Sequence, residues 1–175
     1  LKCANLRRRN QLMSIRFFQM TYQDMGKYLA KNFYNIISVL NSQIIFFPDR
    51  ETILDFLQTC RTILSQDGTI VLQLMNFEKY GDQKLIQLPT RESVRSRLFT
   101  EILSDQEGRC IMSCNIENSS EKILPVMNDV KVYPLVPDEI ESLAEEAGFS
   151  TVEFYSGFDK AEFTGSEDSY VVMLS

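Results

Sequence analysis

Two short apolar runs, Asn35-Ile-Ile-Ser-Val-Leu40 and Thr69-Ile-Val-Leu-Gln-Leu-Met75, lie 28 residues apart and decide the fold of this chain. Such nearly continuous runs are typical of strands that are covered on both faces, as in parallel sheets. Between them, apolar residues recur at helical spacing, at Ile53, Phe56, Leu57, Cys60, Ile63 and Leu64. Asp49 is a plausible N-cap for this helix, and Gly68 follows shortly after its predicted end. The pattern predicts a βαβ unit with a right-handed crossover.

The middle of the chain has a different pattern. Residues 94–103 and 110–117 alternate between apolar and polar side chains, and Asp105-Gln-Glu-Gly108 separates them. Alternation of this kind indicates strands with one face exposed, so we expect an antiparallel hairpin laid over another part of the protein. Residues 130–135 alternate again.

The flanks of this region predict further elements. Residues 15–20 are rich in β-branched and aromatic side chains and predict a strand. A helix is expected to begin at Pro137, beside two acidic residues, and to end before Gly148. Residues 151–155 and 170–174 predict two strands on either side of a polar loop.

The composition is that of one folded domain. The chain has 175 residues, of which 44% are hydrophobic and 24% charged, and this balance argues against disorder. A net charge of −6 argues against nucleic acid as a partner. Histidine is absent from the sequence, which excludes Ser-His-Asp and Cys-His catalytic sites and His-ligated zinc within this chain.

Cysteine usage and hydropathy bear on location. The four cysteines, Cys3, Cys60, Cys110 and Cys114, lack the spacing of a zinc site, so we predict no bound metal and interpret 110 and 114 as small apolar residues on one strand face. We find no signal peptide or apolar stretch of membrane-spanning length, and we expect a reduced cytoplasmic protein without membrane contact. The run Arg7–Arg9 fits a solvated helix face better than a phosphate-binding patch.

Motifs that mark a chemistry on their own are missing. The sequence contains no G-x-G-x-x-G, G-x-x-x-x-G-K or G-x-S-x-G pattern. Single motifs therefore predict an α/β domain and no activity. The order of the segments is more informative.

That order resembles the class I S-adenosylmethionine-dependent methyltransferases. Phe33–Ser42, an amphipathic helix and Cys60–Phe77 match the family's fourth and fifth strands, with Ser65-Gln-Asp-Gly68 at the turn before the fifth. Val132–Glu139 and Glu146–Ser150 are similar to the closing part of the same fold. The resemblance implies a Rossmann-like α/β sheet with an antiparallel last strand and an inserted antiparallel β-hairpin cap.

The resemblance also implies how the chain is divided. Residues 1–175 would form one methyltransferase-like domain, with a partial Rossmann-like core at 1–78, the β-hairpin cap insertion at 79–133 and a return to the core at 134–175. The family's glycine-rich turn and its ribose-binding acid would precede Leu1–Arg9, which resembles the end of a helix. We therefore expect the sheet to lack its first strands here, and the biological protein to be longer.

The resemblance implies S-adenosylmethionine as cofactor, with five residues beside it: Thr21, Tyr22, Leu40, Asn41 and Ser42. It implies substrate contacts by Asn41, Asn76 and Tyr133, and it assigns no catalytic residue. In open α/β sheets ligands bind outside the carboxyl ends of the strands, where residues 40–42 and 76 fall. Two structural alternatives stay open, because Asn41 could form a turn after its strand and Tyr133 could pack under the hairpin.

Within the family, Asn41-Ser42 with Asn76-Phe77 most resembles the glycine and sarcosine N-methyltransferases. That branch has an arginine before the latter asparagine to hold the substrate carboxylate, and Met75 stands there in this chain. A thioether cannot form a bidentate clamp, so glycine is a poor candidate substrate. An arginine near the hairpin could replace it, and the candidates are Arg91, Arg95 and Arg97.

We therefore expect methyl transfer to N or O of a small-molecule acceptor. In this hypothesis Asn41 and Asn76 orient the acceptor, and Tyr133 with the hairpin covers it. One alternative is a non-catalytic methyltransferase-like module for binding or assembly. Another is a nicotinamide-binding Rossmann enzyme, which an antiparallel last strand would disfavour. A homo-oligomer is left open as a further partner.

Overall fold

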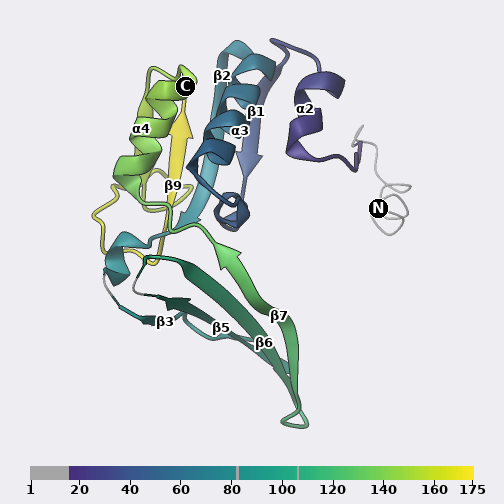
Figure 1. Ribbon diagram of the computed structural model, residues 1–175, viewed down its shortest axis with the longest axis vertical. Coiled ribbons are helices and arrows are strands. Elements are labelled where there is room, and N and C mark those ends of the chain that lie inside the picture. Colours follow the sequence, from purple (N-terminus) through teal and green to yellow (C-terminus); the bar gives the residue numbers. More distant parts are fainter. Residues whose placement is uncertain (1–15, 82, 106) are drawn as a thin grey trace.

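The computed structural model describes residues 16–81, 83–105 and 107–175, and it contains two β-sheets (Figure 1). The first, sheet A, has the strand order β1-β2-β9-β8. Its strands are β1 (Tyr34–Val39), β2 (Leu64–Met75), β9 (Ser169–Leu174) and β8 (Val152–Tyr155). β1 and β2 are parallel, whereas β9 is antiparallel to both of its neighbours. The βαβ unit and the antiparallel last strand are confirmed.

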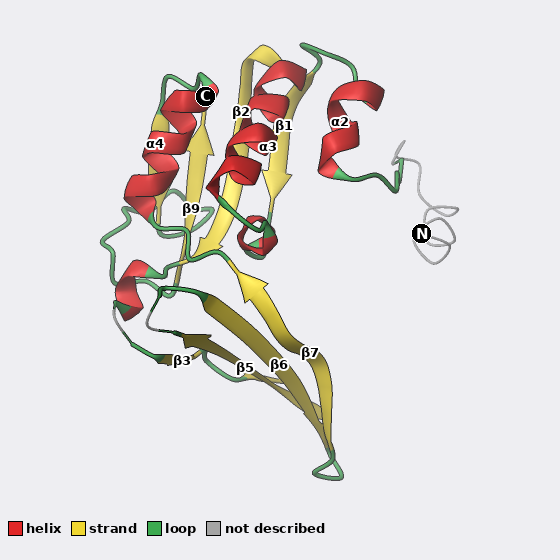
Figure 2. Ribbon diagram, in the orientation of Figure 1, coloured by secondary structure: helices red, strands yellow, loops and turns green. Residues whose placement is uncertain are grey.

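Two helices cover one face of sheet A. α3 (Arg50–Ile63) and α4 (Pro137–Ala147) lie side by side over the strands (Figure 2). α3 begins where predicted, because the Asp49 carboxylate accepts a hydrogen bond of 2.8 Å from the backbone N–H of Thr52. α4 has Pro137 in its first turn and ends at Gly148, whose φ of 88° lies in the left-handed region.

The second sheet, the cap sheet, extends from the end of sheet A where β1 and β2 finish (Figure 1). Its long strands are β5 (Ser96–Ser104), β6 (Cys110–Asn118) and β7 (Ile123–Val132), with β3 (Leu85–Gln87) and β4 (Arg91–Glu92) both paired to β5. All its pairings are antiparallel, so the predicted hairpin is confirmed as part of a larger sheet.

Short elements join the two sheets. η1 (Gln43–Phe46) follows β1, and η2 (Glu78–Tyr80) follows β2. The backbone N–H of Tyr133, just after β7, donates to the carbonyl of Ile45 in η1 at 2.7 Å. Buried side chains of the cap sheet, including Ile102 and Met112, belong to the same hydrophobic core as those of sheet A. Cys110 and Cys114 are buried on this inner face, as expected from their spacing.

The predicted strand at 15–20 is wrong for the residues that the structure describes. Residues 16–20 have no regular secondary structure, and the chain then enters α2 (Tyr22–Tyr28), which packs beside α3. A strand is stabilised by a hydrogen-bonded neighbour, and no described strand pairs with this segment. Its aromatic residues lie at the surface instead, with Phe18 63% exposed. The expectations for residues 1–9 lie outside the described residues.

Gly68 follows the end of α3, as predicted, but it does not lie in a turn. α3 ends at Ile63 and β2 begins at the next residue, so Gly68 lies inside the strand. A Cβ atom at Gly68 would come within 2.8 Å of the Tyr34 carbonyl oxygen and 2.9 Å of Leu64 Cδ2. Glycine is needed here because β1 passes too close for any side chain.

Candidate functional site

A cavity of about 840 Å³ opens at the carboxyl ends of β1 and β2, between sheet A and the inner face of the cap sheet. This edge of an open α/β sheet is where ligands bind. The polar lining includes Asn41, Ser42, Gln43, Gln73, Thr90, Arg91, Thr100, Asp168 and Ser169. The apolar lining includes Ile45, Phe46, Met75, Leu88, Pro89, Leu98, Met112, Met127 and Val130.

The turn Asn41-Ser42 forms the sheet side of this cavity. Both residues have φ of 55°, in the left-handed region, which asparagine tolerates better than most side chains. Gln73 holds the turn: its side-chain oxygen accepts from Asn41 N–H at 3.0 Å, and its backbone oxygen accepts from Ser42 N–H at 2.9 Å. The Ser42 hydroxyl accepts from Met75 N–H at 2.9 Å. Within the described residues the Asn41 side-chain amide has no hydrogen bond, so it is available to a ligand.

Asn76, the other predicted substrate residue at this edge, is fully buried, with 0% of its surface exposed. Its amide nitrogen donates to the carbonyls of Gly165 at 2.8 Å and Glu167 at 3.1 Å. Its amide oxygen accepts from Lys79 N–H at 3.3 Å. Asn76 is absent from the cavity lining. The contacts give Asn76 a structural role in joining β2 to the loop before β9, and direct contact with a substrate has no support in this geometry.

That loop brings an acid to the cavity wall. Asp168 accepts a hydrogen bond of 2.7 Å from Lys79 Nζ and one of 3.1 Å from the Tyr80 hydroxyl. The hydrogen bond from Lys79 is the main reason why the pKa of Asp168 is lowered. Burial and the same carboxylate raise the pKa of Tyr80 to about 12. Asp168 therefore lines the cavity as a carboxylate that is paired with Lys79.

The two residues predicted near the adenine do not line the cavity. Thr21 donates through its hydroxyl to Asp24 at 2.9 Å at the start of α2. The ring of Tyr22 packs against Phe47, with ring centroids 4.9 Å apart. Leu40 is 39% exposed and directly precedes the Asn41 turn, without lining the cavity itself. Roles of Thr21, Tyr22 and Leu40 beside a cofactor stay predictions.

Tyr133 faces a separate cavity of about 620 Å³, with Phe47, Pro48 and Lys131 among its lining residues. Its hydroxyl donates to the Glu139 carboxylate. Burial, reinforced by this carboxylate, raises the pKa of Tyr133 to about 12. The structure thus separates Tyr133 from Asn41, and the interpretation of Tyr133 as a packing residue has better support than substrate contact.

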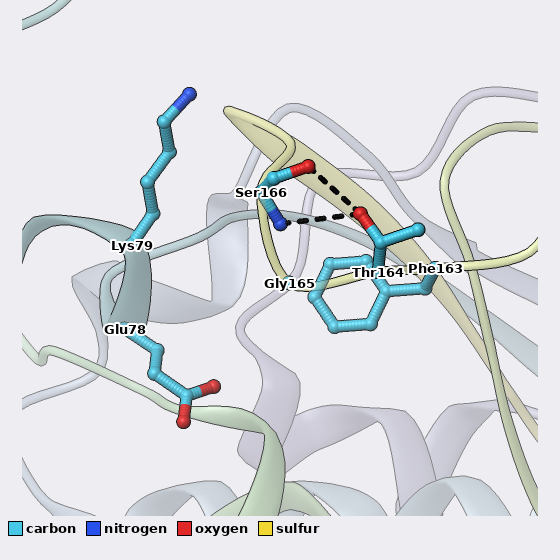
Figure 3. Close-up of a pocket in the computed structure, with 6 residues that line it drawn as sticks. All are labelled: Glu78, Lys79, Phe163, Thr164, Gly165 and Ser166. Carbon is cyan, nitrogen blue, oxygen red and sulfur yellow. Dashed lines mark hydrogen bonds between the residues drawn. The ribbon is translucent and has the colours of Figure 1, made fainter.

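An open depression of about 590 Å³ lies beside the Asn76 loop, between η2 and residues 163–166 (Figure 3). Figure 3 shows the side chains of Glu78 and Lys79 pointing in opposite directions on one side of it. On the other side, the hydroxyl groups of Thr164 and Ser166 lie 2.7 Å apart and bond to each other. These contacts stabilise the loop and bring no reactive groups together.

Sequence reasoning missed several polar residues of the main cavity, Gln73 and Asp168 among them. Gln73 is a polar residue in an otherwise apolar run. This polar position could have indicated that the Gln73 side chain contacts a turn or a ligand. No local pattern ties Asp168 to Lys79, which is 89 residues away. Within the described ranges no group of three or more His, Cys, Asp or Glu side chains could hold a metal ion, and no helix is long and apolar enough to cross a membrane.

The fold of the chain is similar to that of several solved structures. The chain aligns with an S-adenosylmethionine-dependent methyltransferase from Clostridium acetobutylicum at a TM-score of 0.76 and 8% identity, over 98% of this chain and 69% of the other. It aligns with the CcbJ methyltransferase from Streptomyces caelestis at 0.69 and 15% identity, over 83% and 58%. The chain has the fold of the S-adenosylmethionine-dependent methyltransferases.

A third likeness, to the sugar N-methyltransferase KedS8 from a Streptoalloteichus species, has a TM-score of 0.57 and 14% identity, over 97% of this chain and 65% of the other. The chain spans 58% to 69% of the length of these three structures. No protein-family model and no curated protein matches the sequence. At these identities the likeness concerns the methyltransferase fold.

Proposed function

We propose that this chain is the acceptor-binding part of an S-adenosylmethionine-dependent methyltransferase that acts on N or O of a small molecule. The observation that carries the proposal is the cavity of about 840 Å³ between the carboxyl edge of a methyltransferase-type sheet and a β-sheet cap. A cavity of this volume matches small-molecule ligands, and its mixed apolar and polar wall suits an organic acceptor.

In this proposal the residues at the edge of sheet A lie beside the cofactor and the acceptor. Gln73 holds the left-handed turn at Asn41-Ser42, and the Asn41 side-chain amide has no hydrogen bond within the described residues, so it can bind a ligand in the cavity. Leu40 offers exposed apolar surface next to this turn. When bound, S-adenosylmethionine supplies a methyl group on a sulfonium, which is already a good leaving group.

The work left to the chain is positioning and exclusion of water. Asn41 would orient the acceptor from sheet A, while Met112, Met127 and Val130 would cover it from the cap sheet. Holding two reactants in line can lower a barrier by about 7–11 kcal/mol in the best cases. The single acid on the wall, Asp168, is paired with Lys79, so we assign no catalytic base.

Two rival functions make different demands. A non-catalytic module of the same fold would keep the cavity but bind no cofactor. Met75, which stands where the glycine and sarcosine N-methyltransferases have an arginine, is an observation in its favour. A nicotinamide enzyme with an all-parallel sheet would lack the antiparallel pairing of β9 that this chain has.

Calorimetric titration of S-adenosylhomocysteine tests the proposal. It should be carried out on the 175-residue chain and on the product of the whole reading frame that encodes it. Binding by either protein supports methyl transfer and justifies a screen of amines and phenols with radiolabelled S-adenosylmethionine. Two folded proteins that both fail to bind would contradict the proposal and favour the non-catalytic module.

The role of Asn41 can be tested in the binding-competent protein. Asn41→Gly removes the amide and keeps a backbone that tolerates positive φ, so it isolates the side chain. We expect turnover to fall about ten-fold, as for loss of one hydrogen bond, with affinity for S-adenosylhomocysteine nearly unchanged. Equal losses of turnover and affinity would rule out this assignment to the acceptor.

A further inference from the structure

The charged groups around the main cavity indicate what kind of acceptor it takes. Arg91 and Asp168 are the charged residues in its lining. Asp168 is held by Lys79 at 2.7 Å and by Tyr80 at 3.1 Å. Arg91 has no carboxylate within ion-pairing distance among the described residues, since no ion pair within them includes it. The cavity therefore presents one cation that no carboxylate of the described ranges neutralises.

Strand register explains why Arg91 faces the cavity and its neighbours do not. Arg91 on β4 lies opposite Leu98 on β5, and directly paired residues of antiparallel strands project from the same face. Leu98 lines the cavity, so Arg91 belongs to the inner face. Glu92 and Arg97 pair on the outer face, where Arg97 forms ion pairs with Glu92 at 3.2 Å and Glu117 at 3.9 Å. The third arginine of this region, Arg95, is exposed in the turn between β4 and β5.

The rest of the cavity wall favours an apolar ligand. Three methionines, Met75, Met112 and Met127, line the cavity from β2, β6 and β7. Thioethers are polarisable and make favourable contacts with aromatic rings, and flexible methionine side chains adapt to the shape of a ligand. A ligand that satisfies both features has one anionic end and an apolar, preferably aromatic, body.

We propose that Arg91 is a specificity-determining residue that selects acceptors carrying a carboxylate on an aromatic or other apolar body. The guanidinium presents a planar fork that matches a carboxylate in two parallel hydrogen bonds. A carboxylate also balances the single unpaired charge, whereas a phosphate monoester carries about −1.5 to −2 at pH 7 and would leave an excess. The inference rests on the proposed function for its statement that the ligand is a methyl acceptor.

The test compares an acid with its neutral isostere. Binding of 4-aminobenzoate and of 4-aminobenzamide is measured by calorimetry, with and without S-adenosylhomocysteine, in the unmodified chain, Arg91→Gln and Arg95→Gln. Arg95→Gln is the matched control, because it removes an equal charge from the adjoining turn. We expect the acid to bind about five-fold more tightly than the amide, or better, in the unmodified chain and in Arg95→Gln. In Arg91→Gln the preference should disappear.

Several results would overturn the inference. These are equal binding of acid and amide, no binding of either, a preference that persists in Arg91→Gln, or a preference lost equally in Arg95→Gln. Tighter binding of phenyl phosphate than of 4-aminobenzoate would exclude carboxylate as the selected group. If S-adenosylhomocysteine fails to bind while the Arg91-dependent preference is present, the proposed methyl transfer fails and the carboxylate site stands.

Discussion

The side chain of Asn76 uses both of its amide hydrogens on the carbonyls of Gly165 and Glu167, and its oxygen on Lys79 N–H. Asn76→Ala would remove the side-chain partner of these backbone groups, which belong to half-buried or exposed residues. Because water can reach some of them, we expect the free energy of unfolding to fall by about 1–3 kcal/mol, measured by urea denaturation. Asn128→Ala is the control, because Asn128 is exposed on β7, and its change should stay within about 0.5 kcal/mol. Similar losses in both variants would refute the structural role.

Replacing two glycines by alanine should change the stability in opposite directions. In Gly68→Ala the new methyl group would overlap the Tyr34 carbonyl oxygen at 2.8 Å, and we expect a loss of stability of about 1–3 kcal/mol, as for overpacking. In Gly26→Ala, within α2, the new Cβ atom would lie 3.7 Å from Thr59 Cγ2, which is an ordinary contact. Alanine is the better helix former, so this variant should gain about 0.4–1 kcal/mol. Thermal unfolding of the two variants measures these changes. If Gly68→Ala leaves the stability unchanged, the close approach of β1 to Gly68 is contradicted.

Tyrosine ionisation sets the alkaline limit of stability. The pKa values of Tyr80 and Tyr133 are raised from 10.0 to about 12 by burial, and each donates to a carboxylate. Above pH 10 the unfolded phenol loses its proton while the folded phenol keeps it, so stability is fully present below pH 10 and falls between pH 10 and about 12. Tyr133→Phe should flatten this decline in urea unfolding measured from pH 9 to 11.5. A decline as steep as in the unmodified chain would exclude a contribution from Tyr133.

At the scale of elements, the first turn of α3 depends on a charge. The Asp49 carboxylate caps the helix through Thr52 N–H, and hydrogen bonds from Thr52 lower the pKa of that carboxyl. This contribution is present above pH 3.8 and is lost as the pH falls through the lowered value. Asp49→Asn keeps a capping oxygen without the charge, so it should destabilise the chain less than Asp49→Ala at pH 7. Both losses should be smaller than that of Asn76→Ala in the same urea titration, and the reverse order would contradict the cap.

The elements that sequence could predict are those whose determinants are local. Residues 69–75 form a strand whose apolar side chains are buried or half-buried, and Asp49 and Gly148 bound helices through contacts within one turn. The strand at residues 35–40 was also predicted, but its expected cover on both faces is wrong, because no residue of β1 is buried and Ile36 is 68% exposed. The prediction of a strand at residues 15–20 was wrong because a strand also needs a neighbouring strand to pair with, and composition does not reveal one. The need for glycine at position 68 could not be predicted, because it arises from the Tyr34 carbonyl, which is distant in sequence.

The site was predictable only in part for the same reason. Asn41 and Ser42 were placed correctly at the carboxyl end of β1, because the direction of a parallel strand fixes that edge. The clamp at Asn76 and the pairing of Asp168 with Lys79 join residues 89 or more positions apart. Which arginine faces the cavity depended on the register of β4 against β5, and no periodicity in so short a strand reveals it.

At the scale of the whole molecule, sheet A is covered unequally. α3 and α4 cover one face, and β1 is the edge strand of the sheet within the described residues. Several large apolar side chains on and beside β1 are exposed, including Ile36 at 68% and Phe33 at 66%. An exposed apolar edge strand offers unpaired backbone groups to another chain, so this edge is the place where we expect the 175-residue chain to self-associate.

A charge at that edge should suppress such association. In Ile36→Lys the cation would stand at the exposed edge and oppose pairing with a second strand, while little buried surface is lost. We expect the weight-average mass in sedimentation equilibrium at high protein concentration to fall toward that of one 20.3 kDa chain. Val94→Lys is the matched control, because Val94 is 100% exposed in the turn between β4 and β5 and should leave the mass unchanged. If both variants associate as the unmodified chain does, the contact lies elsewhere than at β1. If the unmodified chain is already monomeric, the edge does not drive association, and the unequal cover of sheet A has no consequence for assembly.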